Sequence, residues 1–286
     1  MPSVLSRAAG ARLETQPFPH LVVEGALDPP LYQELVSSFP PLEVVSGHAP
    51  PWRNNFAYLL SAHEVMQHPM VSERWRTFFA HHVSHDFWRE ALELVAAPLL
   101  ALHPDLPRLA GKPLESFVAA PRRGPESAAA DVLLDCQFAI NSPVSEASTV
   151  RTAHIDRPNK LFNALLYCPV PGDPTPGGEL DAFRFIGRPA FLSGRQAAPS
   201  RIEVAKTVPY AANTLFLFLN SERSVHGVRP RPATPYVRRY LNFMAESRVP
   251  LFRVPELGRV GRLVERATTA LRGRRSYSSP PSVLRG

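Results

Sequence analysis

The sequence predicts a mainly β protein with flanking helices, in which an antiparallel sandwich or jelly roll forms the core. Six short runs rich in Val, Phe, Leu and Tyr lie between residues 133 and 245 and are separated by Pro, Gly and Asn, a pattern typical of strands and turns. The runs leave no room for crossover helices, which parallel strands would need. The 32 Pro among 286 residues interrupt long helices and argue against a helical bundle.

The first third of the chain is expected to contain the helices. Residues 17–27 predict a short extended piece, and residues 28–40 predict a helix that Asp28 caps and that has Pro29 and Pro30 in its first turn. Residues 71–102 have apolar side chains at helical spacing and predict two helices.

The predicted strands follow from residue 133 onward. We expect a helical and extended buttress at 1–120, a β core at 121–250 and a tail at 251–286. The six predicted strands are 133–141, 161–169, 179–185, 202–208, 214–220 and 237–245.

The net charge of +7 is concentrated in the tail. Residues 253–286 hold eight Arg and two Glu, a balance of +6, whereas residues 1–252 hold 24 basic and 23 acidic groups. In the stretch 256–273, apolar residues share one side of a helix and arginines another, so we expect a basic amphipathic helix followed by a disordered end at 276–286. The nearly neutral body argues against nucleic acid as a substrate.

Cysteine content and hydropathy predict a cytoplasmic protein without a membrane span. Cys136 and Cys168 are too few for a disulfide scaffold or a structural zinc site, and they fit a reducing compartment. The longest charge-free apolar stretch has about 15 residues, fewer than the roughly 20 needed to span a bilayer, and no secretory signal is recognisable. Three Lys beside 29 Arg indicate a GC-rich bacterial source.

A His-x-Asp motif and a later histidine form the main candidate site. His154 and Asp156 lie between two predicted strands, and His226 follows the predicted strand 214–220. Residues i and i+2 of an extended segment point to the same side, so both side chains of the motif can reach one metal ion. Two imidazoles and one carboxylate are the ligands of facial-triad iron(II) sites, which leave positions open for substrate and oxygen. The sequence therefore predicts an iron site at His154, Asp156 and His226.

A later strand offers a guanidinium group to an anionic ligand. Twelve residues after His226, the side chains of Arg238, Tyr240 and Asn242 share one face of the strand. The opposite face is apolar and is expected to contact the N-terminal helices. An arginine on the polar face can bind a carboxylate bidentately, as a dicarboxylate cosubstrate that chelates the iron requires.

Four stretches resemble the 2-oxoglutarate- and iron(II)-dependent oxygenases of the prolyl-hydroxylase-like group. They are HIDRPNKLFNALLYCP (154–169), GGEL (177–180), ANTLFLFLNSERSVHGV (212–228) and RRYLNF (238–243). The resemblance covers residues 135–246, and the opening segment 17–40 also looks like the start of such enzymes. It implies a double-stranded β-helix, a jelly-roll core that is buttressed by the N-terminal helices.

The resemblance also implies roles for individual residues. His154, Asp156 and His226 match the iron ligands, and Arg238 matches the arginine that binds the distal carboxylate of 2-oxoglutarate. The family's gap between the last histidine and this arginine is somewhat shorter than twelve residues, so Arg239 remains an alternative. The implied reaction consumes oxygen and 2-oxoglutarate, releases succinate and carbon dioxide, and hydroxylates the substrate. Asp156 occupies the place that related halogenases leave to a halide; desaturation and ring formation remain open.

Other polar side chains near these motifs are candidates for ligand binding, each with an ordinary structural role as its alternative. The candidates for contacts to the cosubstrate are Gln137 and Tyr167, and those for contacts to the substrate are Asn141, Asn163, Lys160 and Trp52.

A rival metal site is offered by a second histidine cluster. His81, His82 and His85, with Asp86, place histidines i and i+4 on one helical face. The cluster lacks the glutamate of His-Glu-x-x-His and a third ligand at suitable spacing, so we expect an ordinary surface helix there.

These patterns predict a soluble dioxygenase that uses iron(II), 2-oxoglutarate and oxygen to hydroxylate an unactivated carbon of a small molecule. A natural-product intermediate and an amino-acid-like compound both fit as substrate. One alternative is a cupin-like metalloenzyme that does not use 2-oxoglutarate. The other is a non-catalytic jelly-roll binding module that uses its basic tail on nucleic acid or an anionic membrane. No pattern indicates the oligomeric state.

Overall fold

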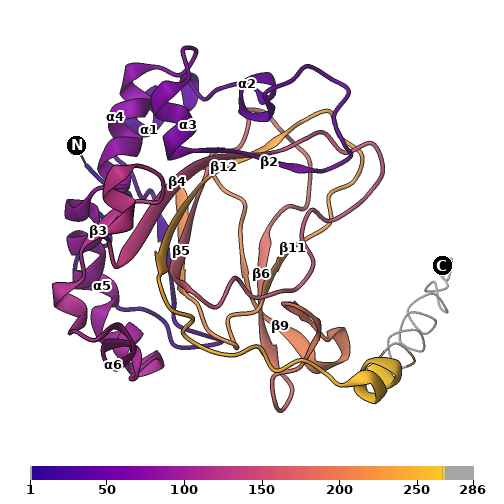
Figure 1. The fold of residues 1–286 in the computed structure, drawn as a ribbon. Helices are drawn as coiled ribbons and strands as arrows, with labels where there is room; N and C mark the ends of the chain where they lie inside the picture. The colour runs from indigo at the N-terminus through magenta and orange to yellow at the C-terminus, as the bar shows by residue number, and fades with distance from the viewer. Residues whose placement is uncertain (1, 266, 268–286) are drawn as a thin grey trace, which may run out of the picture.

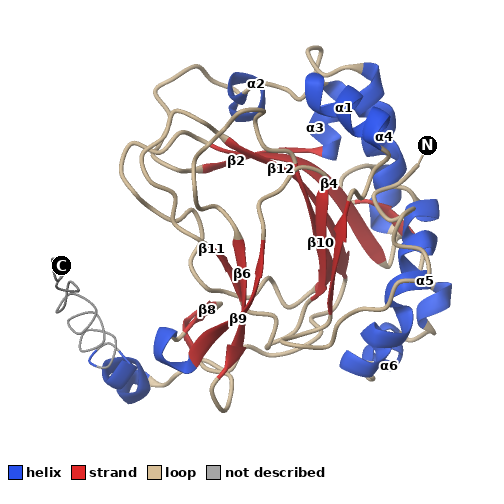
Figure 2. Cartoon of the chain, turned by 180° about the vertical axis from the view of Figure 1, so that it is seen from behind, coloured by secondary structure: helices blue, strands red, loops and turns tan. Residues whose placement is uncertain are grey.

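The residues described in the computed structural model, 2–265 and 267, form two β-sheets that face each other, with helices on the outer side of the larger sheet (Figure 1). The view from behind shows the same layers, with most of the helices beside the larger sheet and the tail helix beyond the smaller one (Figure 2). This confirms the predicted mainly β fold with flanking helices, and the two facing sheets form the jelly roll, or double-stranded β-helix.

The larger sheet contains seven strands, which are β1 (His20–Glu24), β2 (Ala57–Ser61), β3 (Ala119–Pro121), β4 (Val132–Asn141), β5 (Lys160–Tyr167), β10 (Thr214–Leu219) and β12 (Arg238–Ser247). Their order is β1-β10-β5-β12-β4-β2, with β3 beside β4. All neighbours are antiparallel except β3 and β4. β4, β10 and β12 are almost continuously buried, because one face meets the helices and the other meets the second sheet.

The smaller sheet contains three strands in the order β11-β6-β9, which are β11 (His226–Val228), β6 (Leu180–Phe185) and β9 (Ile202–Val208). A separate hairpin is formed by β7 (Phe191–Ser193) and β8 (Gln196–Ala197). Gln196 of this hairpin forms a backbone bridge with His154. The hairpin therefore lies beside the segment that carries the His-x-Asp motif.

The helices precede β4, apart from one short 3-10 turn before β9 and the helical residues 259–265 of the tail. Ser72 and Ser84 cap the N-termini of the two helices predicted at 71–102. The hydroxyl oxygens of these serines accept hydrogen bonds from the backbone nitrogens of Trp75 and Phe87, respectively. The helices are α1 (Pro29–Ser37), α2 (Leu42–Ser46), α3 (Ala62–Gln67), α4 (Glu73–His82), α5 (His85–Leu102) and α6 (Leu106–Ala110), and the 3-10 turns are η1 (Leu114–Ser116), η2 (Pro125–Ala128) and η3 (Pro199–Arg201).

The main core lies between these helices and the outer face of the larger sheet. Trp75 and Phe79 of α4 contact Phe138 of β4, with ring centroids 4.7 and 4.6 Å apart. Leu241 and Phe243 of β12 are fully buried in the same core, on the face predicted to contact the helices. The alternation along β12 thereby directs its polar side chains toward the space between the sheets.

The second histidine cluster needs a correction, because His82 is not a surface residue. It is fully buried; its Nε2 accepts a hydrogen bond from the Val4 backbone at 3.0 Å, and its Nδ1 donates to the Phe78 carbonyl at 2.7 Å. The Nδ1 of His85 lies 3.2 Å from the Ala119 backbone nitrogen, from which it accepts a hydrogen bond. These histidines therefore connect the helices to neighbouring segments.

The tail leaves the two sheets after β12 (Figure 1). Residues 259–265 are helical, as predicted, and Val260 and Leu263 are 74% and 65% exposed, so this apolar side is not packed on the jelly roll. Glu265 is buried and accepts a hydrogen bond from the Ser200 backbone at 2.8 Å. The rest of the predicted helix and the predicted disordered end lie outside the described residues. None of the described helices has the length and apolar character needed to cross a bilayer.

Candidate metal centre and cosubstrate pocket

The structure brings His154, Asp156 and His226 together. The backbones of His154 and His226 exchange two hydrogen bonds of 2.9 Å, so the segment before β5 pairs with the start of β11. Ile155 points the other way into a small apolar cluster, as alternation along an extended segment requires. One ligand atom from each of the three side chains lies within 4.8 Å of the other two, and all three residues are buried.

Both histidines present a neutral Nε2 to this centre. The Nδ1 atoms of His154 and His226 lie 2.8 and 3.0 Å from the carbonyl oxygens of Thr152 and Ser224. A carbonyl oxygen only accepts, so each Nδ1 carries the proton and each Nε2 keeps its lone pair. Burial lowers the pKa of both histidines, that of His154 to about 3, so neither imidazole is charged at neutral pH. This is the state that metal binding requires.

Asp156 is held as an oriented carboxylate. Its burial raises the pKa, but the nearby Lys160 and the two histidines outweigh this and lower the pKa to about 2. The Lys160 ammonium lies 3.5 Å from Oδ1, and the Asn163 side-chain amide donates to Oδ2. The structure thus places Asn163 and Lys160, two predicted substrate contacts, against the carboxylate of Asp156, a candidate metal ligand. Hydrogen bonds of this kind orient metal ligands.

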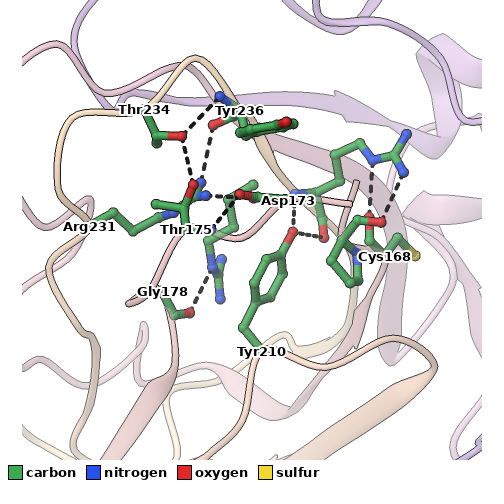
Figure 3. A network of polar contacts seen from close by, with 11 residues as sticks. Cys168, Asp173, Thr175, Gly178, Tyr210, Arg231, Thr234 and Tyr236 are labelled. Carbon is green, nitrogen blue, oxygen red and sulfur yellow. Dashed lines mark hydrogen bonds and ion pairs between the residues drawn. The ribbon is translucent and has the colours of Figure 1, made fainter. Parts of the chain in front are cut away.

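Arg238 forms a second part of the site. Its side chain is 2% exposed; Nε donates to the Gly178 carbonyl at 2.9 Å (Figure 3), and Nη1 donates to Asn141 Oδ1 at 3.3 Å. Among the described residues, Nη2 has no hydrogen-bond partner and no carboxylate lies within 4 Å of the guanidinium. Three aromatic rings surround the guanidinium carbon, with centroids 4.7, 4.9 and 5.3 Å away: those of Tyr210, Tyr240 and Tyr167.

Two further buried polar atoms beside Arg238 lack partners within the described part of the chain: the Tyr167 hydroxyl and Asn141 Nδ2. Burial raises the pKa of Tyr167 to about 12, although Arg238 acts in the opposite direction, so the hydroxyl keeps its proton. Nη2 of Arg238, the Tyr167 hydroxyl and Nδ2 of Asn141 are therefore three buried donor groups around one guanidinium. A buried cation without a counter-ion costs several kcal/mol, and a carboxylate beside Arg238 would supply one.

Arg239 lies in a different environment. Its Nε and Nη2 donate to the carbonyl oxygens of Cys168 and Pro169 at 3.0 and 3.1 Å (Figure 3), and its guanidinium lies 4.8 Å from the Phe39 ring. The Tyr210 hydroxyl accepts a hydrogen bond from the backbone nitrogen of Arg239 and donates one to the carbonyl oxygen of Arg239. These two bonds fix the start of β12. Neighbouring strand residues point to opposite faces, so the Arg239 side chain lies on the opposite face of β12 from the Arg238 side chain.

A buried polar network supports the segment that leads to Gly178. Arg231 donates to Asp173 at 2.7 Å and to the Tyr236 carbonyl at 3.2 Å, and both partners of the ion pair are at most 4% exposed (Figure 3). The Thr175 and Thr234 hydroxyls lie 2.7 Å apart. The network ties the loop after β5 to the loop before β12. Sequence reasoning missed it, since only the density of Pro and Gly marks these loops.

Two glycines lie next to Arg238 and its neighbouring loop. Gly177 and Gly178 have φ of +85° and +84°, a region that side chains disfavour. A Cβ on Gly177 would lie 2.1 Å from the Pro230 carbonyl oxygen, and one on Gly178 would lie 3.2 Å from Arg238 Cδ. The two glycines therefore allow the chain to approach β12 closely enough for the hydrogen bond from Arg238 Nε to the Gly178 carbonyl oxygen.

The remaining candidates lie farther from these centres. Gln137 donates to Asp135 Oδ2 at 2.9 Å and accepts from Asn242 at 3.1 Å, so its amide is used within the inner face of β4 and β12. Trp52 lines a separate cavity of about 520 Å³ with Asn54 and Pro143. The residues that border this cavity include none of the three candidate metal ligands and not Arg238. Neither residue contacts the groups that surround Arg238.

No family model matches the chain, and no curated protein matches its sequence. Among solved structures, the chain is similar to a prolyl 4-hydroxylase from Pseudomonas putida, with a TM-score of 0.44 and 16% identity over 80% of this chain and 93% of that one. A prolyl 4-hydroxylase from Phytophthora capsici gives 0.44 and 15%, over 90% of this chain and 68% of that one. A dioxygenase for auxin oxidation from Arabidopsis thaliana, in a complex with 2-oxoglutarate, gives 0.40 and 12%, over 85% and 89%.

Proposed function

We propose that the protein is an iron(II)- and 2-oxoglutarate-dependent dioxygenase that hydroxylates an unactivated carbon of a small molecule. The observation that carries this proposal is the presence, between the same two sheets, of a buried three-ligand cluster and a buried arginine without a carboxylate partner among the described residues. The cluster suits a divalent metal, and the arginine suits the far carboxylate of a dicarboxylate.

The donor set fits iron(II). Two neutral imidazole nitrogens and one carboxylate leave open positions on a six-coordinate metal, as oxygenases of this type require. The Nδ1 bonds of His154 and His226 and the contacts of Asn163 and Lys160 to Asp156 fix the ligand orientations. These four supports come from three separate segments of the chain, so the cluster is organised by the fold.

The residues of the chain then have distinct tasks. His154, Asp156 and His226 would hold the metal, and Arg238, with the Tyr167 hydroxyl, would bind the distal carboxylate of 2-oxoglutarate. Bound together, iron and 2-oxoglutarate would supply the oxidising chemistry, in which oxygen is consumed and succinate and carbon dioxide are released. The Phe218 ring, 4.6 Å from that of His226, and the tyrosines around Arg238 would make the surroundings of both groups less accessible to water.

The proposal is tested first by binding and then by turnover. Anaerobic calorimetry should show one equivalent of Mn(II) or Fe(II) binding to the wild-type protein, followed by one equivalent of 2-oxoglutarate. Exposure to air with iron(II) and ascorbate should then release succinate slowly, even without a substrate. His226→Ala should abolish metal binding and succinate release. His63→Ala, a change at an exposed histidine outside the cluster, should leave metal binding and succinate release intact.

Two results would contradict the proposal. Metal binding without 2-oxoglutarate binding would favour a jelly-roll metalloenzyme that uses another cosubstrate or none. Absence of metal binding would favour a binding module.

A further inference from the structure

A cavity of about 440 Å³ lies directly beside the metal-binding histidine His154. Its walls come from two segments, the residues 149–152 that precede the His-x-Asp motif and the turn 194–196 of the β7–β8 hairpin. This volume is within the usual range of about 300–1,000 Å³ for small-molecule sites. Arg238 does not border the cavity, so the space is separate from the proposed cosubstrate anchor.

Two arginines line this cavity, and the backbone of each is fixed to the metal-binding segments. The carbonyl oxygen of Arg151 accepts from the Val228 backbone at 2.9 Å, in the strand that begins with His226. The carbonyl oxygen of Arg195 accepts from the Ile155 backbone at 3.0 Å, between the other two metal ligands. Both arginines are therefore held at a defined place relative to the metal centre.

Arg151 is exposed and Arg195 is half-buried, and both side chains line the cavity. Neither guanidinium makes a hydrogen bond or an ion pair with any residue in the described part of the chain. Burial lowers the pKa of half-buried Arg195, and Arg151 and Arg157 add to this, whereas Asp156 opposes it. Two cationic side chains, Arg151 and Arg195, thus line one cavity, and their charge favours an anionic ligand there.

We propose that the substrate carries an anionic group, a carboxylate or a phosphate, which Arg151 and Arg195 bind beside the metal. The planar guanidinium group can bind either anion bidentately. The substrate class follows from this contact and rests on the proposed function, because the cavity adjoins a proposed metal ligand. The fixed backbones of the two arginines would hold the rest of the molecule within reach of the metal.

The test compares three probes of similar shape: benzoate, phenyl phosphate and neutral benzamide. Ligand-observed NMR titrations use metal-free protein with Arg238→Gln, which removes the other anion site. At least one anion should bind about tenfold or more tightly than benzamide, and the preferred anion tells carboxylate from phosphate. Arg151→Gln or Arg195→Gln should remove the preference. Arg188→Gln, an equal charge change at an exposed residue before the same hairpin, should keep it.

The inference is overturned if benzamide binds as tightly as both anions, or if Arg188→Gln removes the preference equally well. Added KCl gives a check without the cavity variants, since it should weaken the binding of the preferred anion and leave that of benzamide unchanged. Titrations of wild-type protein with metal and 2-oxoglutarate run alongside. If those succeed while the anion preference is absent, only this inference fails; if those fail, the proposed function fails whatever the anions do.

Discussion

Replacement of Arg238 by Gln should separate cosubstrate binding from folding. The free Nη2 and the weakly engaged Nη1, whose bond to Asn141 is 3.3 Å long, are the groups available to a carboxylate. Two hydrogen bonds to a charged group are worth about 1.5–3 kcal/mol each, or about 3–6 kcal/mol together. Because every 1.4 kcal/mol is a factor of ten, Arg238→Gln should weaken 2-oxoglutarate binding by about 100-fold or more.

The assay is anaerobic calorimetry of 2-oxoglutarate with Mn(II)-loaded protein, combined with thermal unfolding. At 100 times the wild-type Kd, 2-oxoglutarate should stabilise the wild-type protein by about 2.7 kcal/mol, and the 100-fold weaker binding should reduce this gain to about 0.4 kcal/mol in Arg238→Gln. Metal affinity should stay the same, since Arg238 contacts none of the three ligands.

Arg239→Gln is the matched control. It removes two hydrogen bonds to the Cys168 and Pro169 carbonyls, so it should lower the free energy of unfolding by about 1–3 kcal/mol. The affinity for 2-oxoglutarate should change by less than about threefold, well under 1 kcal/mol. The opposite outcome, in which the Arg239 variant loses 2-oxoglutarate and the Arg238 variant keeps it, would refute the assignment of the anchor.

Three further predictions concern the metal, the pocket wall and the helical layer. Asn163→Ala removes the amide that orients Asp156 and should weaken Mn(II) binding by about 10- to 100-fold in calorimetry; unchanged affinity would mean that the amide does not matter. Gly178→Ala adds a Cβ 3.2 Å from Arg238 Cδ and should weaken 2-oxoglutarate binding by about tenfold. Gly178→Ala and Gly177→Ala should both lower the melting temperature because both positions have positive φ, and Gly177→Ala should lower it further because its Cβ would lie 2.1 Å from a carbonyl oxygen. Equal losses of 2-oxoglutarate affinity in the two variants would argue against a specific role for Gly178. Burial lowers the pKa of His82 from 6.5 to about 3, so the folded state keeps it neutral while the unfolded chain takes up a proton below pH 6.5. Its contribution to stability is therefore complete above pH 6.5 and decreases as the pH falls toward 3. Between pH 7 and 5, the free energy of unfolding measured in urea should fall by about 2 kcal/mol less in His82→Gln than in the wild-type protein. Equal decreases in the two proteins would contradict this.

The longer strands could be predicted from the sequence, because composition and alternation mark them. The strand predicted at 133–141 is β4, Val132–Asn141, and the two helices at 71–102 are α4 and α5. The three-residue strands β3, β7 and β11 could not be found in this way. Such short strands are defined by their partner, and a partner distant in sequence leaves no local pattern.

In the candidate site, too, the features that depend on local sequence could be predicted, and the contacts between distant residues could not. The spacing of His154 and Asp156 and the alternation around Arg238 are local, so the sequence indicates both. The ion pair between Asp173 and Arg231 joins residues 58 positions apart, and its geometry depends on how two loops pack. Arg195 is likewise brought to the metal ligands only by the backbone pairing of its hairpin with Ile155.

A crystal structure of the anaerobic complex with iron(II) and 2-oxoglutarate tests the central claim most directly. The proposed function predicts an anomalous iron peak bound by Nε2 of His154, Nε2 of His226 and a carboxylate oxygen of Asp156. It also predicts the distal carboxylate of 2-oxoglutarate on Arg238 Nη2 and the Tyr167 hydroxyl. An iron peak elsewhere, or 2-oxoglutarate bound away from Arg238, would contradict it.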